Sequence, residues 1–161
     1  MSPRERDASG RPRNARPRDG LGRPLPRSAS VGVARVPDDA TFTVADGVAL
    51  ADQMLRDDQP FHAHEVLEAL WKTRPASERD LWQGLAQLAV GLTHGLRGNG
   101  PGAVALLRRG GARVGRYGDD APYGIDAAGL AAAAARLADR IEADGLAGLD
   151  PASLRLELRR G

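Results

Sequence analysis

Five stretches of this sequence carry apolar side chains three or four positions apart, a spacing that places those side chains on one face of a helix. The stretches cover approximately residues 44–57, 60–73, 77–96, 101–117 and 126–145. Short connections separate them, and such connections favour antiparallel neighbours. The sequence therefore predicts an all-α fold, a compact bundle of about five helices that forms a single domain over residues 41–161.

Polar residues at the expected helix starts support these boundaries. Thr43 can cap the first helix, with Asp46 three residues later, and Asp126 can cap the fifth. Ser77 and Asp80 have the spacing of a capping box at the start of the third helix. We therefore expect side-chain caps at three of the helix starts.

Two segments are less regular. Gly110 and Gly111 lie in the middle of the fourth stretch, where glycine weakens a helix and can kink it. Residues 153–158 alternate apolar and polar side chains, but no second strand pattern is present to pair with them. We expect these residues to form an extended tail packed on the helices, or a short final helix after Asp150 and Pro151.

Residues 1–40 differ from the rest because they are rich in Arg, Pro, Gly and Ser and nearly lack apolar residues, a composition typical of disorder. Residues 1–30 contain eight arginines and three acidic residues, a net charge of +5, whereas the whole chain has +2. A basic tail can bind nucleic acid through phosphates, although this one has no aromatic residue for base stacking. We expect a disordered tail that is either an accessory nucleic-acid binder or a composition-biased extension.

The chain contains no cysteine, which excludes disulfides, thiolate nucleophiles and thiolate metal ligands. No apolar run reaches the roughly 18 residues that a membrane span needs. The basic N-terminus also lacks the apolar segment of a secretory signal. We therefore expect a cytoplasmic protein with no membrane partner.

The segment with the most chemically active side chains is residues 60–71, which holds two histidines, two glutamates and a tryptophan. At about 100° per residue, Glu68 and Trp71 lie within about 40° of His64, at the edge of the apolar face. Glu65 lies further out, and His62 lies on the opposite side of the helix, where we expect it to be exposed. His64 and Glu68 are four residues apart, so they can form a pair on one helix.

The third helix carries a matching polar line, with Gln83, Gln87 and His94 on one side of an otherwise apolar helix. Buried amides need hydrogen-bond partners, and the short proline-containing loop makes the second and third helices neighbours. We therefore predict that His64 and Glu68 face Gln83, Gln87 and His94.

Two tryptophans, Trp71 and Trp82, flank the loop between these helices. We predict that they pack together, because aromatic side chains bury a large apolar area. In a binding function they would contact a ligand together with Gln83 and Gln87. Three glycines on an adjacent side of the third helix allow another helix to approach closely: Gly84, Gly91 and Gly95.

Three sequence blocks follow one another in a fixed order. They are Phe61-x-x-His64-Glu65-x-x-Glu68-x-x-Trp71, then Gln83-Gly84-Leu85-x-Gln87-Leu88-Ala89, and then Gly98-Asn99-x-x-Gly102-Ala103-x-x-Leu106-Leu107. In this combination, residues from about 48 to 107 resemble the domain of unknown function (DUF) 309 family of small, all-helical, mostly bacterial proteins. The resemblance implies the helical fold, and it implies no particular activity.

Three hypotheses for the function follow from these patterns. The one we favour is a non-enzymatic binding or interaction module that uses the polar seam between the second and third helices, with a protein or a small molecule as partner. The second is a small metal-dependent or acid–base hydrolase-like enzyme that uses His64, Glu65, Glu68 and His94, although no nucleophile is evident. The third is an accessory nucleic-acid binder that acts through the basic tail.

The same residues can be tested against known metal sites. His64 and Glu68 have the spacing that lets two helical side chains share one ion, with His94 as a third ligand. A zincin motif, however, needs a second histidine where Glu68 stands, and a di-iron site needs more Glu-x-x-His motifs than this chain has. We therefore expect no metal or other cofactor. The simplest role for the cluster is a hydrogen-bonded network that fixes the register of the two helices.

Overall fold

The computed structural model describes residues 43–159, so the basic tail of residues 1–40 lies outside the described residues. Five α-helices follow in chain order: α1 (Val44–Arg56), α2 (Pro60–Trp71), α3 (Arg79–Leu96), α4 (Gly100–Gly115) and α5 (Ala127–Asp144). Three short 3₁₀ turns join or follow them: η1 (Ala76–Glu78), η2 (Gly118–Asp120) and η3 (Pro151–Leu154). Residues 43–159 contain no strand, only one antiparallel bridge between Ile125 and Arg159, and the predicted all-α fold is confirmed.

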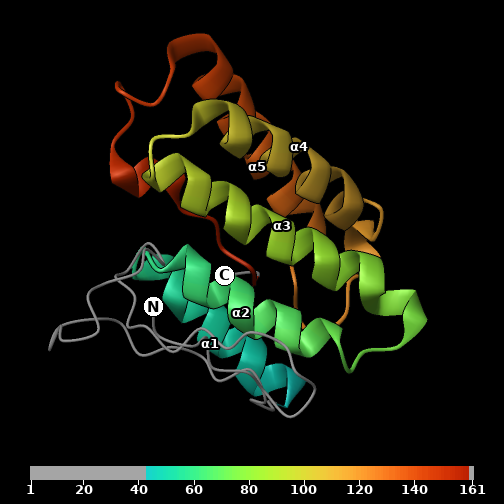
Figure 1. Ribbon diagram of the computed structural model, residues 1–161. Coiled ribbons are helices and arrows are strands. Elements are labelled where there is room, and N and C mark those ends of the chain that lie inside the picture. The colour runs from blue at the N-terminus through green and yellow to red at the C-terminus, as the bar shows by residue number, and fades with distance from the viewer. Residues whose placement is uncertain (1–42, 160–161) are drawn as a thin grey trace, which may run out of the picture.

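The helices are arranged in chain order, and neighbours run in opposite directions (Figure 1). The central helix, α3, packs against α2 on one side and α4 on the other. The outer helices complete the bundle, because α1 packs on α2 and α5 packs on α4. This arrangement gives α3 two neighbours, and the candidate site described below lies along the surface that the three helices share.

Side-chain caps form at two of the three predicted helix starts. Thr43 Oγ1 accepts a hydrogen bond of 3.2 Å from the backbone nitrogen of Asp46. Asp126 Oδ1 accepts one of 3.1 Å from the backbone nitrogen of Gly129. The capping box predicted for Ser77 is wrong, because a 3₁₀ turn precedes α3 and no side chain caps that helix.

Asp80, the other residue of the predicted capping box, binds α4 instead. Its two carboxylate oxygens each accept a hydrogen bond of 2.8 Å, one from Arg113 Nη1 and one from Arg116 Nη1. Two arginines therefore draw the carboxylate away from the backbone of its own helix. The result is a link between the first turn of α3 and the last turn of α4.

The contact between α3 and α4 depends on a pair of facing glycines. A Cβ atom added to Gly110 would lie 2.8 Å from the backbone oxygen of Gly84, and one added to Gly84 would lie 3.0 Å from the backbone oxygen of Gly110. Alanine at either position would therefore collide with backbone, which cannot move aside as a flexible side chain can. Helix α4 continues without a break through Gly110 and Gly111, so these glycines serve close packing in a continuous helix.

The C-terminal residues combine both predicted alternatives. A 3₁₀ turn at Pro151–Leu154 leads into an extended stretch, and we call residues 151–159 the C-terminal strap. Its alternating leucines Leu154, Leu156 and Leu158 are buried in the core. The strap extends from the η3 end of the bundle toward α1 (Figure 1).

Two aspartates of the α1 region bind the C-terminal strap. Asp52 of α1 is 1% exposed, and its carboxylate accepts a hydrogen bond of 3.0 Å from the backbone nitrogen of Leu158. The same carboxylate accepts one of 2.9 Å from Arg56. Asp58 accepts two hydrogen bonds of 2.8 Å from the guanidinium of Arg155. The first helix and the last described residues are therefore joined directly.

The glycine pair gives a first prediction. Gly110→Ala should lower the free energy of unfolding by up to about 2 kcal/mol, because overpacking costs roughly 1–3 kcal/mol and the better helix propensity of alanine offsets about 1 kcal/mol. Gly148→Ala is the matched control, since a Cβ atom there meets nothing within 4 Å. Urea unfolding of the two variants measures the difference. Equal stability of the two variants would contradict the close-contact explanation.

The Asp58–Arg155 pair gives a second prediction, which concerns pH. The hydrogen bonds from Arg155 are the main cause that lowers the pKa of Asp58 below its ordinary value of 3.8. A carboxyl group whose pKa is lowered by folding stabilises the protein above the pKa it has in the unfolded chain, and the stabilisation is lost as pH falls through the folded value. Wild type should therefore be more stable than Asp58→Asn above about pH 5, and the difference should shrink steadily in more acidic solution.

Thermal unfolding of the wild type and of Asp58→Asn between neutral and acidic pH checks this prediction. Asparagine suits the position because residue 58 has a φ of 57°, a backbone conformation that asparagine tolerates better than most residues. The substitution therefore changes the charge without adding backbone strain. A stability difference that does not depend on pH would show that the charge of Asp58 is not what binds the strap.

Candidate functional site

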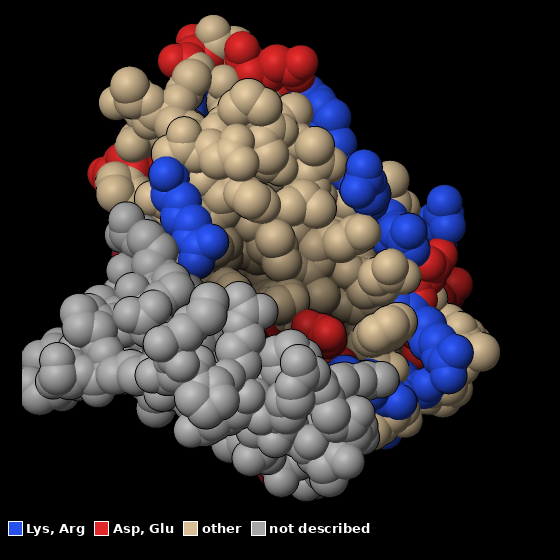
Figure 2. All heavy atoms as spheres, in the orientation of Figure 1, with Lys and Arg blue, Asp and Glu red and all other residues tan. Residues whose placement is uncertain are grey.

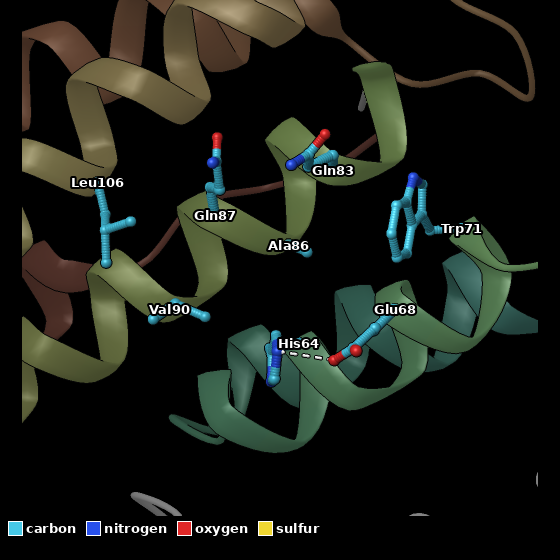
Figure 3. Close-up of a pocket in the computed structure, with 8 residues that line it drawn as sticks. All are labelled: His64, Glu68, Trp71, Gln83, Ala86, Gln87, Val90 and Leu106. Carbon is cyan, nitrogen blue, oxygen red and sulfur yellow. Dashed lines mark ion pairs between the residues drawn. The ribbon is translucent and has the colours of Figure 1, made fainter. Parts of the chain in front are cut away.

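A hollow with a volume of about 270 Å³ lies along α3, between α2 and α4. We call it the trough. Eight residues line it: His64, Glu68 and Trp71 from α2, Gln83, Ala86, Gln87 and Val90 from α3, and Leu106 from α4 (Figure 3). On the face of the molecule shown in Figure 2, the surface over α3 and α4 is largely free of charged side chains, and basic side chains stand at its margins. The trough is therefore an apolar hollow with a few polar groups.

The α2 side of the trough contains the predicted histidine–glutamate pair. His64 Nε2 lies 3.1 Å from Glu68 Oε2, and both side chains are partly exposed, at 24% and 45% respectively. The ring of Phe61 lies beside His64, with 5.7 Å between the ring centroids. The predicted pairing of His64 with Glu68 is confirmed. Glu68 is the acidic residue among the eight that line the trough.

The two glutamines lie in the α3 surface of the trough, as predicted from the helical spacing. Figure 3 shows Gln83 and Gln87 on one side of α3, while Ala86 and Val90 point toward α2. Gln83 Oε1 accepts a hydrogen bond of 3.0 Å from Arg113 of α4. The side-chain nitrogen of Gln83 is therefore the group of its amide that remains to donate a hydrogen bond.

His94 does not join this group, so that part of the prediction is wrong. His94 is absent from the lining of the trough, and its Nδ1 lies 3.0 Å from Nδ2 of Asn99. The angular position of His94 on the helix was suitable, but it lies seven residues beyond Gln87. Seven residues correspond to about 10 Å along a helix, which places His94 beyond the end of the trough.

The predicted exposure of His62 is also wrong. His62 is completely buried, and its Nδ1 lies 3.2 Å from Glu65 Oε1. The physical reason is that α2 is covered by both α1 and α3, so its buried arc is wider than a single apolar stripe. Val66, which is also completely buried, lies only about 40° from His62 on the helix and extends this arc. Glu65 therefore pairs with His62, and neither residue lines the trough.

The two tryptophans have different surroundings. Trp71 lines the trough, whereas Trp82 is completely buried and its ring centroid lies 6.0 Å from that of Tyr123. The aromatic ring beside Trp82 is therefore that of Tyr123. Trp82 was predicted to contact a ligand together with the glutamines, but it does not line the trough. Trp71 is the tryptophan available to a ligand.

Within residues 43–159, three residues of the trough carry a buried polar atom that has no hydrogen-bond partner. These atoms are His64 Nδ1, Trp71 Nε1 and Gln87 Oε1. Most buried polar atoms in proteins are hydrogen-bonded, and each exception requires an explanation. An unpaired buried donor or acceptor costs about 1–3 kcal/mol, so three of them around one hollow are unfavourable for a purely structural network.

The three predicted metal ligands are not brought together. His64 and Glu68 form a pair, but His94 lies outside the trough. Across residues 43–159, no group of three or more His, Cys, Asp or Glu side chains has the geometry to hold a metal ion. The chemistry that the trough offers is therefore one carboxylate, one imidazole, two amides and one indole on an apolar surface.

Three apolar positions of the trough were not identified from the sequence as site residues. These are Ala86, Val90 and Leu106, and Leu106 comes from α4, which the sequence did not place beside the polar seam. Leu106 occurred in the sequence patterns only within the third block, one position before Leu107. Among the described helices, none is long and apolar enough to cross a membrane.

Comparisons with known proteins match the part of the chain that contains the trough. The family model described as "Domain of unknown function (DUF309)" matches residues 49–106, a segment that contains all eight residues of the trough. A protein of Bacillus subtilis (strain 168), "Uncharacterized protein YpuF", is 46% identical over 48 residues, which cover 29% of this chain and 28% of the relative. No solved structure matches the chain. Residues 49–106 therefore match the DUF309 family, as the three ordered sequence blocks predicted.

Proposed function

We propose that this domain is a non-enzymatic interaction module that binds a short segment of a partner protein in the trough. The observation that carries the proposal is an apolar hollow lined by His64, Trp71 and Gln87, each with a buried polar atom that lacks a partner. Apolar concave surfaces with a few polar groups are typical of binding sites. In a network that served only to fix helix register, these atoms would be bonded to one another.

The size of the trough favours one or two side chains of a protein ligand over a complete cofactor. Its volume of about 270 Å³ lies just below the range of roughly 300–1,000 Å³ that is typical of small-molecule sites. An apolar side chain of the partner can lie against Val90 and Leu106. Burial of a side chain such as valine or leucine contributes roughly 1.5–3 kcal/mol, enough for an anchor but not for a tight complex by itself.

The polar groups of the trough supply orientation. Trp71 Nε1 can donate a hydrogen bond, Gln87 Oε1 can accept one, and the carboxylate of Glu68 is 45% exposed and forms an ion pair with His64. A ligand that bonds to these groups gives the buried atoms the partners that they lack. This is the usual division of labour in binding sites, where apolar contacts give affinity and a few polar groups give specificity.

A second candidate is an acid–base enzyme, and the His64–Glu68 pair is the observation that favours it. The carboxylate binds Nε2 of the imidazole, so Nδ1 is left to accept or donate a proton, as in catalytic pairs of histidine and carboxylate. Among the described residues that line the trough, however, none is a Ser, Thr, Cys or Lys that could act as a nucleophile beside it. Glu65 and His94, which the sequence suggested for this role, lie elsewhere.

Peptide selection tests the proposed binding function. Peptides selected from a random displayed library against the full chain should bind Gln87→Ala about tenfold more weakly than wild type, because about 1.4 kcal/mol, close to the value of one hydrogen bond, corresponds to a factor of ten. Val90→Glu, which places a charge on the apolar surface, should bind more weakly still. Isothermal titration calorimetry measures both affinities, and thermal unfolding shows whether the variants remain folded.

Gln53→Ala is the matched control for Gln87→Ala. Gln53 lies on α1, is exposed, and donates its side-chain hydrogen bond to Asp57. Its replacement should leave peptide affinity unchanged. Selected peptides that bind Gln87→Ala and Val90→Glu as tightly as they bind wild type would exclude the trough as the binding site.

A panel of chromogenic esters and phosphate esters separates the enzyme from the binding module. We expect wild type and His64→Gln to hydrolyse the panel at the same rate as buffer. Turnover by wild type that disappears in His64→Gln, with both proteins folded, would favour the enzyme and reject the module.

A further inference from the structure

We infer that the ligand of the trough is an extended peptide segment, whose backbone is hydrogen-bonded by Gln83 and Gln87 and which carries a basic side chain against Glu68. This inference rests on the proposed function, since it names the ligand class of the same trough. It makes the trough a site that recognises backbone conformation and one charge, rather than a particular sequence of apolar residues.

The spacing of the two glutamines fits an extended backbone. Gln83 and Gln87 are four residues apart on one helix, which separates them by about 6 Å along its axis. In an extended chain, groups that point the same way recur every second residue, at about 6.6–6.8 Å. The side-chain amides of Gln83 and Gln87 can therefore bond to peptide groups two residues apart. A helical ligand offers no such groups, because its internal backbone donors and acceptors are already paired.

The amide chemistry of the two positions is complementary to a peptide backbone. A glutamine side chain carries a carbonyl oxygen and an NH₂ group, the same acceptor and donor types as a peptide bond. Gln87 Oε1 is buried and has no partner among the described residues, so it can accept a hydrogen bond from a backbone N–H of the ligand once the side chain turns toward it. Gln83 Oε1 is held by Arg113, which turns its NH₂ group into a donor for a ligand carbonyl.

The positions of the apolar and polar residues separate the ligand's side chains from its backbone. Figure 3 shows Gln83 and Gln87 on one side of α3, with Ala86 and Val90 directed toward α2. A strand whose backbone lies over the glutamines therefore directs alternate side chains toward the space between α3 and α2. In that space an apolar side chain contacts Val90, and the next one on the same side comes close to Glu68.

The protein already binds one extended segment in this way, namely its own C-terminal strap. Leu154, Leu156 and Leu158 are buried while the intervening Arg155 and Glu157 are exposed. The backbone nitrogen of Leu158 donates to the side chain of Asp52, which lies on a helix. A helix side chain that bonds to the backbone of an extended segment with alternating buried and exposed residues is thus present in this bundle.

Charge selects the polar side chain of the ligand. Glu68 is the acidic group in the trough and is 45% exposed, whereas Arg113, the basic group nearest to Gln83, is bound to Asp80. A lysine or arginine of the ligand therefore gains an ion pair with Glu68, and an acidic residue at the same position is repelled. The expected pattern is alternating apolar residues with one basic residue on the same face.

Defined peptides and the full chain test this inference. The reference probe is a nine-residue capped peptide of alternating valine and serine, with lysine in place of one central valine. Three comparison peptides carry one backbone N-methyl group, glutamate in place of the lysine, or the same residues arranged with helical spacing on an alanine background. Calorimetry gives the affinities, and NMR of the glutamine side-chain NH₂ resonances locates the contact.

The reference probe should shift the NH₂ resonances of Gln83 and Gln87 and leave those of Gln53 unchanged. N-methylation at the central position should weaken binding about tenfold, and the glutamate peptide should bind more weakly than the lysine peptide. In Glu68→Gln the preference for lysine should disappear while the N-methyl effect remains. This pattern of variant and peptide effects is not produced by a merely structural role of either residue.

Several outcomes would overturn the inference. These are a tighter complex with the helical peptide, an affinity that does not respond to N-methylation, or glutamine resonances that shift with protein concentration alone, which would identify a second copy of the chain as the occupant. If library-selected peptides bind in the trough but ignore N-methylation and charge, the inference fails and the interaction module stands. If neither selected nor designed peptides shift the trough resonances, the proposed function itself fails.

Discussion

The close contact between α3 and α4 is the constraint on which the rest of the structure depends. Gly84 and Gly110 bring two helix backbones together where any side chain would hold them apart. The trough lies beside this contact, because a Cβ atom added to Gly110 would lie 3.1 Å from Cβ of Gln87, which lines the trough.

The polar side chains beside this contact join α3 to α4, whereas the sequence suggested a hydrogen-bonded network between α2 and α3. Asp80 and Gln83 both bind Arg113, so the first turn of α3 is tied to the end of α4. This link fixes the orientation of one glutamine of the trough and leaves the other unbonded at its oxygen. The trough therefore contains one glutamine that is held by a hydrogen bond and one whose oxygen is unbonded among the described residues. This arrangement suits recognition better than it suits maximal stability.

The sequence predicted the helices well because their information is local. The 3.6-residue period, the caps at Thr43 and Asp126, and the four-residue spacing of His64 and Glu68 are all properties of single helices. The errors arose where tertiary packing decides. The burial of His62 depends on how many helices cover α2, and the exclusion of His94 depends on where the hollow ends.

Partners that are distant in the sequence were equally difficult to predict. Ser77 and Asp80 have the spacing of a capping box, but arginines of α4 more than 30 residues away compete for the carboxylate of Asp80. Leu106 reaches the trough from a third helix, and no periodicity within α2 or α3 indicates it. The sequence pattern therefore located the trough on α2 and α3, but the boundary of the trough also depends on Leu106 of α4.

The hydrogen bond from Leu158 to Asp52 has a consequence for biosynthesis. It joins residues 106 positions apart, so α1 cannot complete its buried contacts until the ribosome has released the end of the strap. Contacts of such long sequence separation form late, because the entropy of loop closure must be overcome first. Until the strap has been made, the apolar surface that Leu154, Leu156 and Leu158 cover in the folded protein remains exposed. A chain that stops before the strap therefore exposes apolar surface of the kind that leads to aggregation.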